Sequence, residues 1–135
     1  MTEEIPTLQL IPTTDQFDIQ LSPTPRGVRL ARLLAVEWLR PRRDLPYAVT
    51  EAAAQIIAEL TTNAATHGRV AGRDFRLALR AHPGLLRIEV SDTRGDDLPE
   101  PHSGRGLLLV EALADRWGTT PGPVPRKTVW AELDL

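Results

Sequence analysis

The sequence predicts a two-layer α/β sandwich, in which a mixed, mostly antiparallel sheet of about four to five strands is covered on one face by about three helices. Three observations predict it: short runs that alternate apolar and polar residues, longer segments with apolar residues at helical spacing, and an uneven order of the two along the chain. The antiparallel character comes from the second half, where two alternating runs flank the hairpin turn signal His82-Pro83-Gly84.

The elements follow from these patterns and from their start and stop signals. Residues 1–14 carry prolines and several threonines, and we expect a tail or irregular edge segment ahead of a single domain over 15–135. Ser22-Pro23-Thr24-Pro25 marks a turn and a helix start, and Gly68 is the expected C-cap of the second helix. The expected strands cover residues 17–21, 75–79, 85–90, 117–120 and 128–133, and the expected helices cover 28–39, about 46–66 and about 106–116.

Composition bounds the class of protein. The chain has 135 residues, 41% of them hydrophobic and 25% charged, which is typical of one soluble globular domain. It has no cysteine, so disulfides and thiolate chemistry are excluded. The net charge of −2 gives no electrostatic footprint for nucleic acid. The acidic first residues do not resemble a signal peptide and no segment approaches a membrane span, so we expect a cytoplasmic protein.

The stretch Glu59–Gly68, E-L-T-T-N-A-A-T-H-G, is the strongest candidate for a functional site. At about 100° per residue, Glu59, Asn63 and His67 form a stripe roughly 100°, 60° and 20° to one side of Leu60, the centre of the apolar face. Polar groups so close to a buried edge need partners. A solvated or mutually bonded helix face is the alternative interpretation. The predicted water-facing side carries Glu51, Gln55 and Thr62.

Three further motifs are weak one by one. Asp92 ends a predicted strand and can accept a hydrogen bond from an exocyclic amine such as that of adenine, although an aspartate there also initiates turns. Gly104-Arg105-Gly106-Leu107 opens an apolar helix and could bring backbone N–H groups to a phosphate, or could simply be a hinge. Lys127-Thr128 begins the last strand and includes the only lysine of the chain.

Together, their order and spacing resemble the GHKL ATPase superfamily, and most closely the bacterial anti-sigma factor serine kinases and their actinobacterial relatives. The resemblance rests on E-x-x-x-N-x-x-x-H-G, V-x-D-x-x-G, G-x-G-L at a helix start and a final T-x-W-x-x-L strand, and it covers about residues 17–135. It implies the Bergerat-type ATP-binding fold and a site for ATP and Mg²⁺.

The resemblance implies roles for the residues that match its motifs. Asn63 matches the magnesium ligand, and Glu59 matches the general base that takes a proton from the attacking hydroxyl or water. Asp92 matches the aspartate that binds adenine, and Thr128 matches the threonine that supports it. For His67, packing beside the site and direct contact with the nucleotide both stay open.

The two glycine-bearing loops and one arginine complete the implied site. Gly104, Arg105, Gly106 and Leu107 match the second glycine box, which lies against the phosphates. In the first loop the family usually has D-x-G-x-G, where this chain has Asp92-Thr93-Arg94-Gly95-Asp96, and Gly95 is the glycine of the V-x-D-x-x-G motif. Arg94 stands where the first family glycine is usual, so it contacts a phosphate or obstructs the site. Arg29 matches an arginine with which those kinases dock protein partners, and a solvated helix charge is the alternative.

The resemblance therefore implies an ATP–Mg²⁺-binding regulatory protein, a serine/threonine kinase of the anti-sigma factor type. Its expected partners are a sigma factor or other transcription regulator and a small anti-anti-sigma antagonist of the STAS type. The short lid between Asp92 and Gly104 favours the alternative, a non-catalytic ATP-sensing interaction module. A domain that has lost ATP altogether, and a homodimer, are also left open by the sequence.

Overall fold

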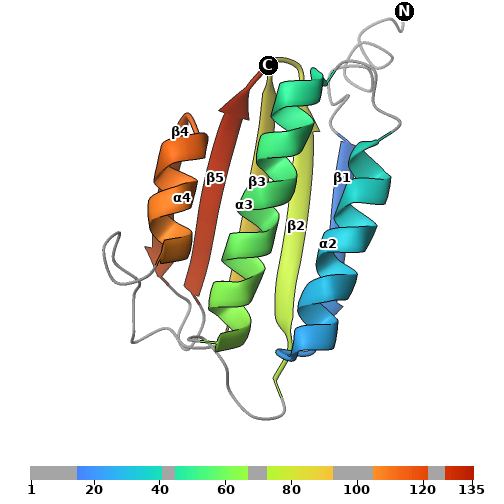
Figure 1. Ribbon diagram of the computed structural model, residues 1–135, viewed down its shortest axis with the longest axis vertical. Helices are drawn as coiled ribbons and strands as arrows, with labels where there is room; N and C mark the ends of the chain where they lie inside the picture. Colours follow the sequence, from blue (N-terminus) through green and yellow to red (C-terminus); the bar gives the residue numbers. More distant parts are fainter. Residues whose placement is uncertain (1–14, 41–44, 67–72, 93–104, 122–126) are drawn as a thin grey trace, which may run out of the picture.

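The computed structural model describes residues 15–40, 45–66, 73–92, 105–121 and 127–135 (Figure 1). Gly68, the expected cap of the second helix, lies outside these residues. The elements in chain order are β1 (Asp15–Leu21), α2 (Pro25–Leu39), α3 (Tyr47–Thr66), β2 (Phe75–His82), β3 (Leu85–Asp92), α4 (Arg105–Leu113), β4 (Arg116–Pro121) and β5 (Lys127–Asp134).

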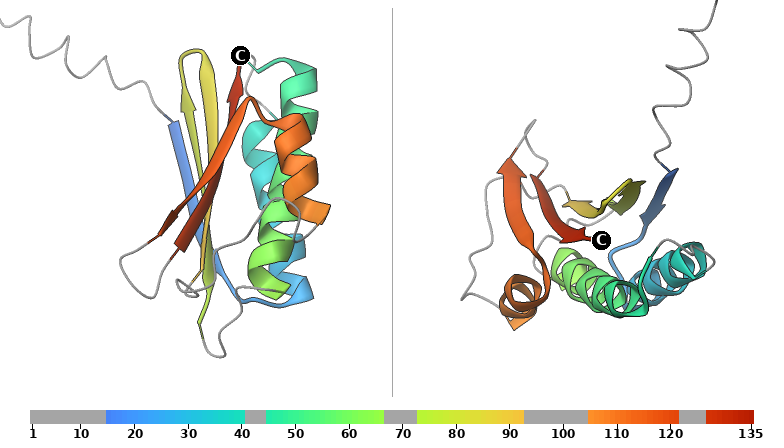
Figure 2. Two further views of the ribbon diagram at one scale, coloured as in Figure 1. Left: turned by 90° about the vertical axis from the view of Figure 1, so that its left-hand side faces the viewer. Right: turned by 90° about the horizontal axis from the view of Figure 1, so that it is seen from above.

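The five strands form one sheet in the order β1-β2-β3-β5-β4, and each of these pairings is antiparallel. Helices α2, α3 and α4 lie on one face, with α3 between the other two (Figures 1 and 2). The predicted two-layer sandwich is thus confirmed. None of the described helices is long and apolar enough to cross a membrane.

The β2–β3 hairpin is closed by Pro83 and Gly84, because His82 pairs with Leu85 in the register. Gly84 has φ of 82°, and proline followed by a positive-φ glycine is the pattern of a type II turn. The predicted turn signal is therefore confirmed, and it fixes which residues of β2 and β3 face each other.

Alternation along the strands separates the two faces of the sheet. Odd positions of β5 and even positions of β3 are buried under the helices, and the positions between them are only partly buried, apart from the buried Ser91 and the exposed Asp134. Helix α3 completes this core with a stripe of buried apolar residues, while Glu51, Gln55 and Thr62 are exposed as predicted. Each fully buried leucine or isoleucine contributes about 1.5–3 kcal/mol. The buried residues of α3 are Ala53, Ile56, Ile57, Leu60, Thr61 and Ala64.

Helix α2 starts where the sequence predicts. The Thr24 hydroxyl oxygen accepts a hydrogen bond of 3.1 Å from the backbone N–H of Gly27, and Pro25 occupies the first turn. A side-chain cap of this kind stabilises a helix by about 1 kcal/mol. It also fixes the angle at which the chain passes from β1 into the helical layer.

The predicted end of the third helix was wrong: α4 ends at Leu113, not near Arg116. Beyond this point the backbone bonds to the sheet and the helix does not continue, because the backbone N–H of Asp115 donates to the Glu132 carbonyl at 2.9 Å. The Asp115 carboxylate in turn accepts from the backbone N–H of Asp134 at 2.7 Å. The local sequence carries no sign of these bonds to a distant strand.

The face of the sheet without a described helix carries a network of ion pairs across its strands. Glu132 lies at its centre, 2.6 Å from an Arg87 nitrogen and 2.9 Å from Arg116 Nε. The Arg87 guanidinium also lies over the Trp130 ring, 4.4 Å from its centre. Gly118 leaves room for this ring, because a side chain at position 118 would clash with it. All four arginines of the described strands are paired with carboxylates on this face, and they are Arg76, Arg80, Arg87 and Arg116.

Glu132→Gln is expected to lower the free energy of unfolding by about 1–2 kcal/mol at neutral pH. The hydrogen bond from Arg116, aided by that from Arg87, outweighs burial and holds the pKa of Glu132 below its ordinary 4.5. A carboxylate with a lowered folded-state pKa adds stability above its unfolded pKa, and this contribution is lost as the pH falls through the folded pKa.

Urea unfolding of both proteins at several pH values measures this contribution. The difference between them should be constant above about pH 5.5 and should shrink as the pH falls below the ordinary value of 4.5. A difference that stays the same down to about pH 2 would show that the carboxylate charge is not its source.

Candidate functional site

The predicted catalytic stripe lies in the last turns of α3. Glu59 and Asn63 are both partly buried there, between the buried residues Leu60 and Ala64 and the exposed Thr62. Four residues separate them, which is about one turn, or roughly 6 Å along the helix axis. The acid and the amide therefore lie at the boundary between core and solvent, as the sequence predicts. His67 lies outside the described residues.

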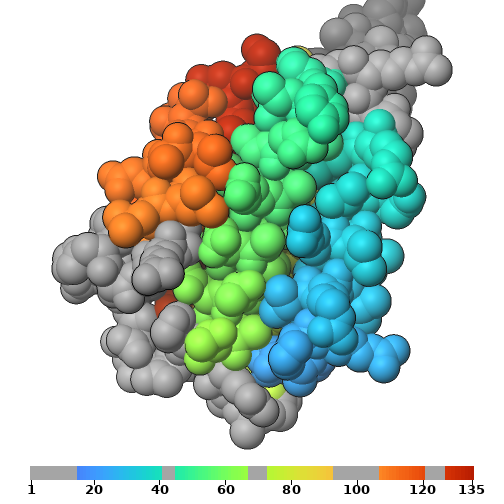
Figure 3. Space-filling view, viewed as in Figure 1, coloured from blue at the N-terminus to red at the C-terminus, as the bar shows by residue number. Residues whose placement is uncertain are grey.

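This stripe faces the α4 flank of α3. Ala65 lines a pocket between α3 and α2. Measured about the helix axis in one direction from Leu60, the three α3 residues of the pocket lie at roughly 140° to 240°, and Glu59 and Asn63 lie beyond them at roughly 260° and 300°. Because α3 runs between α2 and α4 (Figure 3), the side away from α2 is the side of α4.

Asp92 ends β3 on the helix-covered face. It is 6% exposed, and it follows the buried Val90 two residues earlier on the same face. Lys127, directly opposite in the β3–β5 register, places Nζ 3.9 Å from Asp92 Oδ2. A carboxylate held at the end of the buried row can accept from an amine that enters between the sheet and the helices.

Thr128 does not share this face with Asp92. Its hydroxyl lies 2.7 Å from the Ser91 hydroxyl, and these two residues are opposite each other in the register. Because successive side chains of a strand point to opposite faces, Ser91 and Thr128 belong to the face opposite that of Asp92 and Lys127. Lys127 is therefore a neighbour of Asp92 on the helix-covered face, and Thr128 lies on the other face.

The second glycine box is described only from its second residue onward. Arg105 and Gly106 are the first residues of α4, and Leu107 is 1% exposed in the core. The first N–H groups of an α-helix have no partner within it and favour negative charge, so this helix start suits a phosphate. Three other predicted site residues, Arg94, Gly95 and Gly104, lie outside the described residues.

These segments meet at one end of the molecule. The end of β3, the start of β5, the C-terminal half of α3 and the start of α4 all lie toward the lower end of Figure 1. Helix α3 packs against β3, β5 and α4. The ends of four segments that are distant in the sequence, including those that carry Asp92 and the Glu59/Asn63 stripe, thus lie toward the same end of the molecule.

The donor set fits a magnesium nucleotide. Among the described residues, no group of three or more His, Cys, Asp or Glu side chains could hold a metal by itself. Mg²⁺ that is shared with phosphates needs only one or two protein oxygens, since it keeps several waters. The amide oxygen of Asn63 can supply one such oxygen, the start of α4 favours phosphate, and the Asp92 carboxylate can accept a hydrogen bond from the amine of a base.

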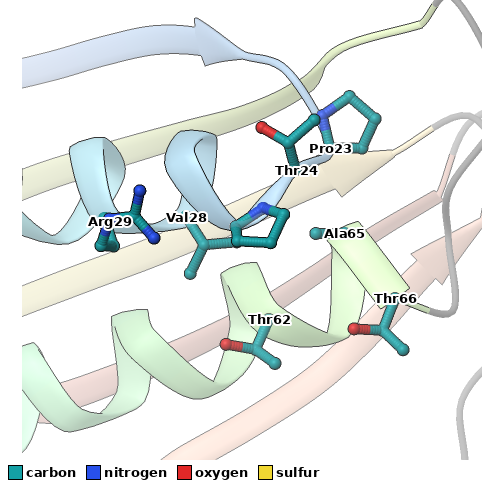
Figure 4. Close-up of a pocket in the computed structure, with 8 residues that line it drawn as sticks. Pro23, Thr24, Val28, Arg29, Thr62, Ala65 and Thr66 are labelled. Atoms are coloured by element: carbon teal, nitrogen blue, oxygen red, sulfur yellow. The ribbon is translucent and has the colours of Figure 1, made fainter.

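A separate pocket of about 510 Å³ lies on the other flank of α3. The first turns of α2 and the last turns of α3 form its walls, with Arg29 on the α2 side (Figure 4). The sequence prediction singled out Arg29 but not the pocket, which arises from packing of two helices. Its lining residues are Pro23, Thr24, Pro25, Val28, Arg29, Thr62, Ala65 and Thr66.

Comparison with known families identifies the class of protein. Residues 21–131 match the histidine kinase-like ATPase domain, and the chain belongs to this family. The resemblance to GHKL ATPases is thereby confirmed, and ATP binding is the activity that membership implies.

The fold over the whole chain is also found in solved structures, and the following is one example. A chain in the crystal structure of the SiaB–SiaC complex from Pseudomonas aeruginosa superposes with a TM-score of 0.60 at 12% sequence identity. The match covers 100% of both chains. At this identity the likeness establishes the fold. A comparison with curated protein sequences finds no match.

Proposed function

We propose that the protein binds ATP with Mg²⁺ and phosphorylates a serine or threonine of a small antagonist protein of the STAS type, and that it also holds a sigma factor or another transcription regulator. The observation that carries the proposal is the Glu59/Asn63 stripe on the α4 flank, near the strand end that holds Asp92. The resemblance to anti-sigma factor kinases supports the class of partner, and the SiaB–SiaC complex of the structural neighbour supports a partner that is a protein.

Each residue has a distinct role in this proposal. Asp92 accepts a hydrogen bond from the adenine amine, while Asn63 ligates Mg²⁺, which neutralises phosphate charge. Glu59 accepts the proton of the substrate hydroxyl. The hydroxyl oxygen then forms a bond to the γ-phosphorus as the bond between this phosphorus and the β,γ-bridging oxygen breaks, and ADP leaves. Positioning and charge neutralisation supply most of the rate.

Incubation with γ-labelled ATP, Mg²⁺ and a candidate STAS-type antagonist tests the reaction. We expect label on a serine or threonine of the antagonist, with none when Mg²⁺ is chelated. Nucleotide binding by calorimetry without label transfer to any antagonist would favour the alternative, an ATP-sensing module. Two sequence features favour that alternative: the short lid between Asp92 and Gly104, and the arginine at position 94, where the family usually has glycine.

The outer face of α2 suits an acidic partner. Arg26, Arg29 and Arg32 are exposed, and none of them has an ion-pair partner among the described residues. Leu33 beside them is 63% exposed. The arginines on the sheet face are all paired, whereas these three arginines lie on the helix whose first turns form one wall of the 510 Å³ pocket.

Arg29→Gln is expected to weaken the complex with the protein partner by about tenfold or more, because a charge that meets a carboxylate at an interface is lost. ATP affinity should stay the same, since Arg29 lies on the opposite flank of α3. Arg40→Gln is the matched control, the same change about 16 Å further along α2. Equal weakening by both variants, measured by calorimetry, would argue against docking at the pocket.

A further inference from the structure

The only lysine of the chain is buried beside the predicted adenine site. Lys127 is 4% exposed and Asp92 is 6% exposed. The Lys127 ammonium lies 3.9 Å from the Asp92 carboxylate. Lysine is almost never this buried unless its charge is paired. All other basic residues are arginines, so the compact ammonium at this place is distinctive.

The register explains why the two charges share one location. Asp92 and Lys127 are directly opposite at the end of β3 and the start of β5. Behind them the same row continues with Val90 opposite Val129, both buried and apolar. The ion pair therefore forms the polar end of an otherwise apolar row, under the helices and at the edge where the four site segments meet.

The pair presents an acceptor next to a donor. An ionised carboxylate only accepts hydrogen bonds, and an ammonium only donates them. The Watson–Crick edge of adenine has the complementary order, with the N6 amine as donor beside N1 as acceptor. A single carboxylate reads only the amine, whereas the pair can read both positions.

Building on the proposed function, we infer that Lys127 is a second base-reading residue, which donates to adenine N1 while Asp92 accepts from the N6 amine. The threonine expected from the resemblance points to the other face of the sheet. Lys127 therefore takes the place beside the aspartate, and it supplies a charged donor in place of a hydroxyl.

Binding of ATP analogues to the unaltered protein tests this inference. In 1-deaza-ATP a CH group replaces N1, and in 7-deaza-ATP a CH group replaces N7, so the two analogues are matched. We expect 1-deaza-ATP to bind about tenfold to a hundredfold more weakly than ATP, because a hydrogen bond from a charged group is lost. 7-deaza-ATP should bind within about threefold of ATP, since the inference leaves N7 without a charged partner.

Equal affinity for ATP and 1-deaza-ATP would overturn the inference and leave the proposed function intact. An equal loss with both analogues would overturn it too, since the effect would not be specific to N1. A protein that binds none of the three nucleotides would overturn both the inference and the proposed function.

Two measurements assign the effect to Lys127 itself. Lys127→Met should bind ATP and 1-deaza-ATP equally, and a variant that keeps the wild-type preference would overturn the inference. Because the chain has one lysine, ¹⁵N-lysine labelling gives a single ε-ammonium resonance in the unaltered protein. ATP should shift this resonance strongly and 1-deaza-ATP only weakly, and equal shifts would overturn the inference even if the methionine variant fails to fold.

Discussion

Asp92→Asn is expected to weaken ATP binding by about tenfold to a hundredfold. The substitution replaces an acceptor-only carboxylate by an amide that carries no charge, so the bond from the adenine amine loses its charge assistance. It also leaves the buried Lys127 ammonium without the carboxylate 3.9 Å away. Calorimetry with ATP and Mg²⁺ measures the affinity, and thermal unfolding shows how much of the protein is folded.

Thr128→Ala is the informative control for Asp92→Asn. The resemblance assigns Thr128 to the nucleotide site, but its hydroxyl contacts Ser91 on the opposite face of the sheet. We therefore expect the ATP affinity of this variant to stay within about twofold of wild type. A loss as large as that of Asp92→Asn would show that the resemblance assigns Thr128 correctly and that the nucleotide reaches it by another route.

Glu59→Gln is expected to reduce phosphoryl transfer by about 10²–10⁴-fold, the range that a positioned general base contributes. The side chain keeps its shape and loses its ability to accept a proton, so ATP affinity should change by less than about threefold. Rates of label transfer under single-turnover conditions separate the chemical step from binding.

Glu51→Gln provides the matched control on the same helix. Glu51 lies about two turns earlier on the exposed side of α3, so the same change there should leave both transfer and affinity unaltered. If Glu59→Gln left the rate of phosphoryl transfer unchanged, Glu59 would not be the general base. Wild-type protein that binds ATP but transfers no phosphate would leave the ATP-sensing alternative.

The local elements could be predicted because their causes are local. The Thr24 cap, the proline–glycine turn ending at Gly84 and the helical spacing of α3 all act within a few residues, and each is confirmed by the structure. The partial burial of Glu59 and Asn63 followed from the same periodicity. Helix geometry alone determines which residues share a side.

The remaining features depend on partners that are distant in the sequence. The true end of α4 is fixed by hydrogen bonds between Asp115 and β5: the Asp115 N–H donates to the Glu132 carbonyl, and the Asp134 N–H donates to the Asp115 carboxylate. The separation of Asp92 from Thr128 depends on which residue of β5 faces which residue of β3. Alternation alone predicts that Lys127 and Val129 share one face of β5. It does not predict that Lys127 lies opposite Asp92 of β3. The pocket beside Arg29 likewise arises only when two helices pack.

The position of α3 between the proposed nucleotide site and the Arg29 pocket has a thermodynamic consequence. One continuous helix borders both, so a ligand on either flank acts on the same rigid body. If bound nucleotide changes the partner's dissociation constant by some factor, linkage requires the partner to change the nucleotide's dissociation constant by the same factor. The cellular abundance of a partner would then affect how much of the protein carries ATP, and the ATP concentration would affect how much of the protein carries the partner.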